Sequence, residues 1–108
     1  MTVESLAKTC GFEVVCMPSP EREAVGAYIG DLLSWVMGKA DSDNVWITIM
    51  SNINVIAVAT LADVSCIVLA EGVTLDPEIL ATAEAKGVNV LSSSLSAYGI
   101  AKTIYGIV

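Results

Sequence analysis

Short runs of consecutive hydrophobic residues alternate with longer mixed segments through the second half of the chain. Three such runs, rich in β-branched side chains, predict buried strands at residues 45–50, 66–70 and 88–91. The hydrophobic spacing and the capping residues around these runs predict helices at 53–62, 77–86 and 95–105. The clearest helix signal is Asp76 followed by Pro77, with Gly87 beyond the end. From residue 45 onward, strand and helix therefore alternate.

The first half of the chain predicts a less regular arrangement. Thr2 is suited to cap a helix at 3–9, and Gly11 is placed to end it. Further along, the sequence predicts a strand at 12–16, a short edge strand at 25–28 and a helix at 32–37 with Asp31 or a neighbour as its N-cap.

Alternation of short buried strands with helices is typical of right-handed crossovers and a parallel sheet. The predicted fold class is therefore α/β, a three-layer α/β/α arrangement with a mostly parallel central sheet. A length of 108 residues accommodates one hydrophobic core, so residues 1–108 are expected to form a single domain.

The hydrophobic content is high for so small a chain. It amounts to 55% of the residues, and the helix at 53–62 has apolar side chains on nearly every side. Such a helix is either fully buried or faces a partner chain. We therefore expect a homodimer.

The charge distribution excludes several classes of partner. The net charge is −7, and the five basic residues are scattered singly, so the chain cannot neutralise a run of phosphates. We expect no binding to nucleic acid. The apolar stretch at 45–70 is interrupted by polar residues and Asp63, which favours two strands around a helix over a membrane span. The absence of a secretory signal favours a cytoplasmic protein.

The side chains of common catalytic sites are scarce. The chain contains no histidine, and its three cysteines, Cys10, Cys16 and Cys66, show no CxxC spacing. These absences argue against nucleophile–histidine pairs and against a zinc site. We predict no catalytic residues, no metal ligands and no cofactor.

Polar residues follow each of the three predicted central strands. Ligands of parallel α/β sheets bind beyond the carboxyl ends of the strands, so these residues are candidates for ligand binding, although each also fits an ordinary cap or turn. The candidate ligand-binding residues are Ser51, Asn52, Asn54, Glu71, Gly72, Ser92, Ser93 and Ser94.

Two stretches of the chain resemble the DRTGG domain family. One is Val-Trp-Ile-Thr-Ile-Met-Ser-Asn at 45–52, and the other is Ile-Val-Leu-Ala-Glu-Gly-Val-Thr-Leu-Asp-Pro-Glu at 67–78, followed by Gly-Val-Asn-Val-Leu at 87–91. These small α/β modules also occur beside catalytic domains such as those of HPr kinase/phosphatase-like proteins. The motif that gives the family its name does not occur here. The HPr kinase label is not carried over, because the chain has no GxxxxGK[ST] loop.

The resemblance implies a stand-alone regulatory domain. The function we predict is non-catalytic sensing of a small ligand, with a nucleotide as one candidate, by a homodimer that acts on a partner enzyme. Two alternatives remain open: an accessory subunit of a metabolic or redox enzyme whose site forms at an oligomer interface, and a purely structural interaction domain.

Overall fold

A computed structural model describes residues 1–108 and contains five helices and five strands. All the predicted elements are present, with ends that differ by at most two residues. Along the chain they are α1 (Val3–Cys10), β1 (Glu13–Cys16), β2 (Ala27–Ile29), α2 (Leu33–Lys39), β3 (Val45–Thr48), α3 (Asn54–Ala62), β4 (Cys66–Leu69), α4 (Pro77–Lys86), β5 (Val90–Ser92) and α5 (Ala97–Ile104).

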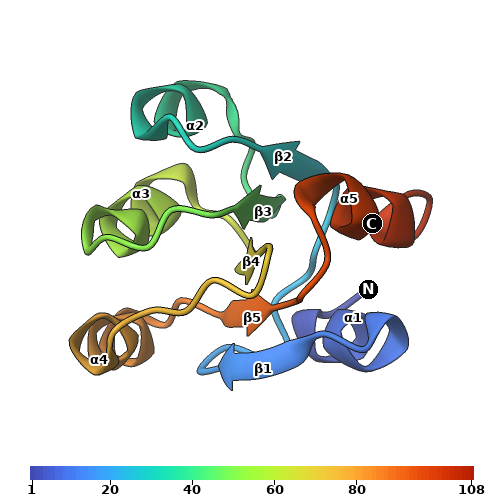
Figure 1. The fold of residues 1–108 in the computed structure, drawn as a ribbon, viewed down its shortest axis with the longest axis horizontal. Helices are drawn as coiled ribbons and strands as arrows, with labels where there is room; N and C mark the ends of the chain where they lie inside the picture. Colours follow the sequence, from blue (N-terminus) through green and yellow to red (C-terminus); the bar gives the residue numbers. More distant parts are fainter.

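The five strands form one sheet in the order β1-β5-β4-β3-β2. The strands from β2 to β5 are parallel to one another and lie in sequence order, and only β1 is antiparallel to its neighbour. Helices α2, α3 and α4 cover one face of the sheet, and α1 and α5 cover the other (Figure 1). The predicted three-layer α/β/α architecture with a mostly parallel sheet is confirmed.

Alternate residues of the two central strands form two separate cores. Trp46, Ile67 and Leu69 pack toward α2, α3 and α4, whereas Ile47 and Val68 pack toward α1 and α5. Every residue of β3 and β4 is buried. Burial on both faces explains why these strands are continuous hydrophobic runs rather than alternating ones.

The helix ends follow the predicted caps in part. The Thr2 side chain accepts a hydrogen bond from the Ser5 N–H, and Gly11 and Gly87 adopt left-handed conformations at helix ends. Asp76 occupies the N-cap position of α4, but its side chain makes no capping hydrogen bond.

At the start of α2, the N-cap position belongs to Leu32, the neighbour of Asp31. The Asp31 carboxylate instead accepts hydrogen bonds from the Thr48 hydroxyl at 2.8 Å and the Ile49 N–H at 3.0 Å. Asp31 therefore fixes the end of β3 rather than the start of a helix.

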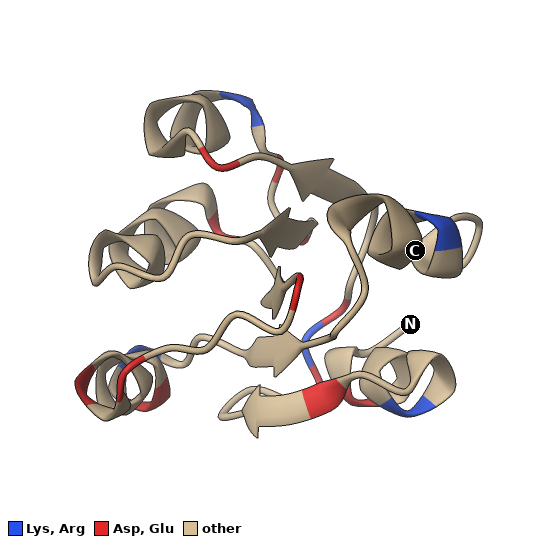
Figure 2. Cartoon of the chain, viewed as in Figure 1, with Lys and Arg blue, Asp and Glu red and all other residues tan.

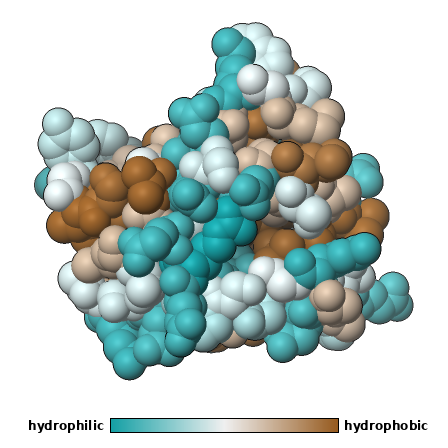
Figure 3. Space-filling view, turned by 180° about the vertical axis from the view of Figure 1, so that it is seen from behind, coloured by the Kyte–Doolittle hydropathy of each residue, from teal (hydrophilic) through white to brown (hydrophobic).

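The helix predicted to be apolar on all sides is buried on one side only. On the outer side of α3, Ile53 is 50% exposed and Leu61 is 71% exposed. None of the helices combines the length and the hydrophobicity needed to cross a membrane. Acidic residues are distributed over most of the fold, but none lies within α2, α3 or α5 (Figure 2). The face opposite that of Figure 1 carries a hydrophilic band between two hydrophobic areas (Figure 3).

Candidate functional site

The carboxyl ends of β3, β4 and β5 lie at one edge of the sheet, because β4 pairs with both of the other strands. After β4 the chain turns to α4 on one face, and after β5 it turns to α5 on the opposite face (Figure 1). Loops that leave in opposite directions open a crevice between them. This place in the fold is called a topological switch point, and α/β sheets typically bind their ligands there. The topology therefore singles out the β4–β5 end.

Backbone hydrogen bonds join the two loops at this switch point. The Glu71 N–H donates to the Leu95 carbonyl at 2.8 Å, and the Gly72 N–H donates to the Ser93 carbonyl at 2.9 Å. The Ser93 N–H in turn donates to the Leu69 carbonyl at 2.9 Å. The position of each loop therefore depends on the other.

Two consecutive residues after β4 adopt left-handed backbone conformations. Glu71 has a φ of 61° and Gly72 a φ of 71°. Glycine adopts this conformation without strain, but a residue with a Cβ atom pays about 1–2 kcal/mol for it. Unlike the other two non-glycine residues with positive φ, which are aspartates, Glu71 has no short side chain that favours this region. Backbone strain is thus stored at the switch point.

The crevice contains a cavity of about 350 Å³. Four of the predicted residues, Gly72, Ser92, Ser93 and Ser94, line it, together with Gly11, Glu13, Val73 and Thr74. Sequence reasoning missed Gly11 and Glu13, because they enter the site through the antiparallel pairing of Glu13 with Ser92. A predicted strand does not reveal which strand it pairs with.

The other four predicted residues lie outside this cavity. Ser51 and Asn52 are exposed at the end of β3, where the Asn52 side chain accepts a hydrogen bond from the Asn54 N–H. Asn54 lines a different groove, between α3 and α4. Glu71 is exposed beside the cavity but does not line it. The structure thus brings together four of the eight predicted residues and separates the other four from them.

The polar groups of the cavity favour a ligand that donates hydrogen bonds. Glu13 contributes the only charged side chain in its lining, and three serines and Thr74 contribute hydroxyls. Part of this capacity is used internally, because the Ser93 hydroxyl accepts a hydrogen bond from the Leu95 N–H. A carboxylate repels phosphate and accepts hydrogen bonds from hydroxyl or amino groups.

Two of the three cysteines are shielded from solvent. Burial, with a hydrogen bond to Glu84, raises the pKa of Cys16 to about 12, and burial raises the pKa of Cys66 to about 12. Both are therefore protonated thiols at neutral pH and poor nucleophiles. No group of three or more acidic or cysteine side chains is arranged to hold a metal ion.

A model of the DRTGG domain family matches residues 6–107 of the chain. Among solved structures, the chain is similar to the CBS and DRTGG domains of the regulatory region of a Clostridium perfringens pyrophosphatase, complexed with its activator diadenosine tetraphosphate. The TM-score is 0.74 and the identity 13%; the match covers 95% of this chain and 45% of the other. At this identity the likeness concerns the fold. No curated protein matches the chain in sequence.

Proposed function

The chain belongs to the DRTGG domain family, and on this premise we propose that it is a non-catalytic regulatory domain that senses a small polar ligand. The observation that carries the proposal is the cavity at the switch point between β4 and β5. Its place in the fold is typical of ligand sites, and its strained backbone at Glu71 is typical of functional positions.

We propose that the ligand is a nucleoside or nucleotide whose sugar faces the acidic side of the cavity. Ribose hydroxyls can donate to the Glu13 carboxylate and exchange hydrogen bonds with the serine hydroxyls, whereas a phosphate group would have to lie away from Glu13. The nucleotide activator of the similar pyrophosphatase regulatory region supports this class of ligand.

Calorimetric titration with adenosine, AMP, ATP, diadenosine tetraphosphate and inorganic phosphate tests the proposal. In Ser94→Phe, the new ring fills the cavity from an exposed position, and we expect affinity for the bound nucleoside or nucleotide to fall about tenfold or more. Ser51→Phe is the matched control, because Ser51 lies at the same edge of the sheet but outside the cavity. Saturable binding by no compound, or equal binding by Ser94→Phe and the wild type, would contradict the proposal.

The proposal also excludes phosphoryl transfer by this chain alone. No lysine or arginine lines the cavity to stabilise charge on a transferred phosphoryl group. We expect the purified protein neither to hydrolyse ATP nor to phosphorylate HPr. Turnover that a point substitution in this chain abolishes would refute this part.

We further propose that the domain works as a homodimer in the cytoplasm and acts on a partner enzyme. Exposed apolar side chains on α2 and α3, including Leu32, Trp35 and Leu61, support self-association. Three free cysteines without a disulfide support a reducing compartment.

A further inference from the structure

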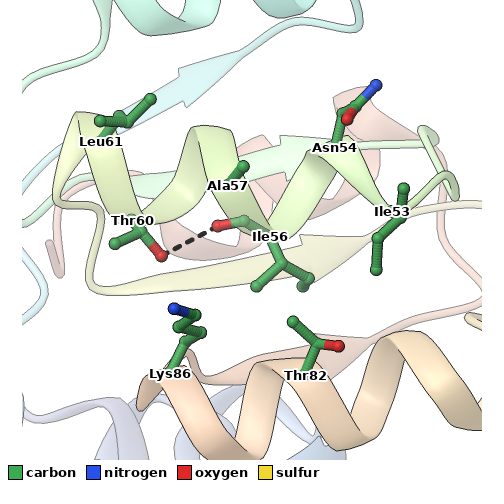
Figure 4. A pocket seen from close by; sticks show the side chains of 8 residues that line it. All are labelled: Ile53, Asn54, Ile56, Ala57, Thr60, Leu61, Thr82 and Lys86. Atoms are coloured by element: carbon green, nitrogen blue, oxygen red, sulfur yellow. Dashed lines mark hydrogen bonds between the residues drawn. The ribbon is translucent and has the colours of Figure 1, made fainter.

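A groove runs between α3 and α4 on the outer side of the helical layer. Its cavity measures about 420 Å³, larger than that of the β4–β5 crevice. The lining side chains project from both helices, with α3 above and α4 below in Figure 4. They are Ile53, Asn54, Ile56, Ala57, Thr60, Leu61, Thr82 and Lys86.

Each helix contributes a row of residues four positions apart, which lie along one side of a helix. The row on α3 is Ile53, Ala57 and Leu61, with two large exposed side chains at its ends and a small one at its centre. A small central residue allows the backbone of another helix to approach closely, while the large residues interdigitate with those of the partner.

The row on α4 is Glu78, Thr82 and Lys86, with opposite charges at its two ends. Neither Glu78 nor Lys86 takes part in a salt bridge within the chain. A row with one charge at each end is complementary to itself when two copies run in opposite directions. The α4 row therefore favours antiparallel packing, and the near-symmetric α3 row is compatible with it.

The charge of the whole chain favours the same surface. Two copies with a net charge of −7 repel each other, and the repulsion is reduced where acidic residues at the contact are few or lie opposite a basic residue. Neither α2 nor α3 contains an aspartate or glutamate, and α2 extends the apolar surface with Trp35, which is 58% exposed.

We infer that a second copy of this chain covers the groove, related by a twofold axis that crosses α3 near Ala57. In this arrangement Leu61 packs against Ile53 of the partner subunit, and Lys86 pairs with Glu78 of the partner subunit. The inference rests on the homodimer proposed above and names its surface. The groove between α3 and α4 is separate from the proposed ligand cavity, which lies at the β4–β5 end of the sheet.

Light scattering during size-exclusion chromatography tests the surface. We expect a dimer for the wild type at micromolar concentrations and a monomer for Leu61→Asp, which places two carboxylates in the apolar contact. Tyr98→Asp is the matched control, because Tyr98 is 76% exposed on α5, at the other face of the sheet, and it should remain dimeric.

A charge exchange separates a second copy from any other occupant. Lys86→Glu and Glu78→Lys should each weaken the dimer about tenfold, and the double variant should restore it, because the exchanged charges meet again across the twofold axis. Circular dichroism checks that each variant is folded. A monomeric wild type would overturn both the homodimer and the surface. A dimer that tolerates Leu61→Asp, or a double variant without recovery, would overturn the surface alone.

Discussion

The two ends of the central sheet are built differently. At the amino ends of the parallel strands, side chains are bonded to one another and to the segment that crosses between β1 and β2. At the carboxyl ends of β4 and β5, backbone hydrogen bonds hold the loops, and half-buried and exposed hydroxyls line a cavity. The first end, which we call the closed end, uses its polar groups internally. The second, which we call the open end, leaves them available to another molecule.

The closed end depends on one arginine and two asparagines. Arg22 donates to Asp43 at 3.0 Å and to Asp63 at 2.8 Å. Asn44 and Asn89 are buried and bonded to the backbone. No buried side-chain nitrogen or oxygen lacks a hydrogen-bond partner. From this difference we expect stability to depend mainly on the first end, and the proposed function places ligand binding at the second.

Among the substitutions that test this difference between the two ends, Asn89→Ala should lower the free energy of unfolding most. The Asn89 side chain, 1% exposed, accepts from the Ser19 N–H and donates to the carbonyls of Ser19 and Ser65. Its loss leaves the Ser19 N–H and the Ser65 carbonyl without partners, whereas the Ser19 carbonyl still accepts from the Arg22 N–H, at a cost of about 2–4 kcal/mol in the free energy of unfolding. Urea denaturation measures the cost. Asn52 is an exposed asparagine at the carboxyl end of β3, and Asn52→Ala should lower the free energy of unfolding by less than about 1 kcal/mol. Equal losses for the two variants would contradict the expectation that stability depends mainly on the closed end.

Arg22→Met should have the next largest effect. It should lower the free energy of unfolding by about 1–2 kcal/mol, because it removes hydrogen bonds to two carboxylates. Hydrogen bonds from Ser42 and then Arg22 lower the pKa of Asp63 below its ordinary 3.8. That stabilisation is present above pH 3.8 and is lost as the pH falls through the lowered pKa. The difference in the free energy of unfolding between the variant and the wild type should therefore begin to shrink as the pH falls below 3.8. A constant difference down to pH 2 would exclude Asp63 as the cause.

Glu71→Gly should change the free energy of unfolding less, and should raise it rather than lower it. Glycine relieves the left-handed strain but increases the entropy of the unfolded chain, so we expect a net gain of about 0.5–1 kcal/mol. Glu71→Ala removes the carboxylate and keeps the Cβ atom, so it should give no such gain. Thermal unfolding of the two variants separates strain from charge; equal melting temperatures would show that the backbone at Glu71 is not strained.

The smallest effect concerns thiol chemistry. Cys16 and Cys66 are buried, and each has a pKa of about 12, so neither should react with a disulfide reagent at pH 8. Cys10, half-buried beside the cavity residue Gly11, should react slowly, because burial also raises its pKa. Native protein should release one equivalent of the reporter thiolate, and protein unfolded in guanidinium all three. Rapid reaction of a second cysteine in the native protein would mean that the closed end opens.

The fold could be predicted from the sequence because its signals are local. The runs at β3 and β4 are hydrophobic throughout since both faces are covered, and Pro77 and Gly87 mark the ends of α4. These features depend on residues close together in the chain. The family resemblance rested on the same stretches, and the match over residues 6–107 confirms it.

The candidate site could be predicted only in part. The serines after β5 and Gly72 follow directly from the rule that strand ends bind ligands. Glu13 could not be found this way, because its place depends on β1 pairing with β5 from the far end of the chain. Asn54 lines the groove of α3 and α4, which depends on how these two helices pack.

The pairing of β1 with β5 also has a consequence for folding during synthesis. The strands from β2 to β5 meet neighbours that are close in sequence, so their pairing can begin as soon as each emerges from the ribosome. β1 is the first of the five strands to be synthesised, but it has no strand to pair with until β5 has been made. The cavity is complete only after that step, because it joins Gly11 and Glu13 to Ser92, Ser93 and Ser94. A ligand held there would stabilise only the finished domain and would slow the release of its first strand.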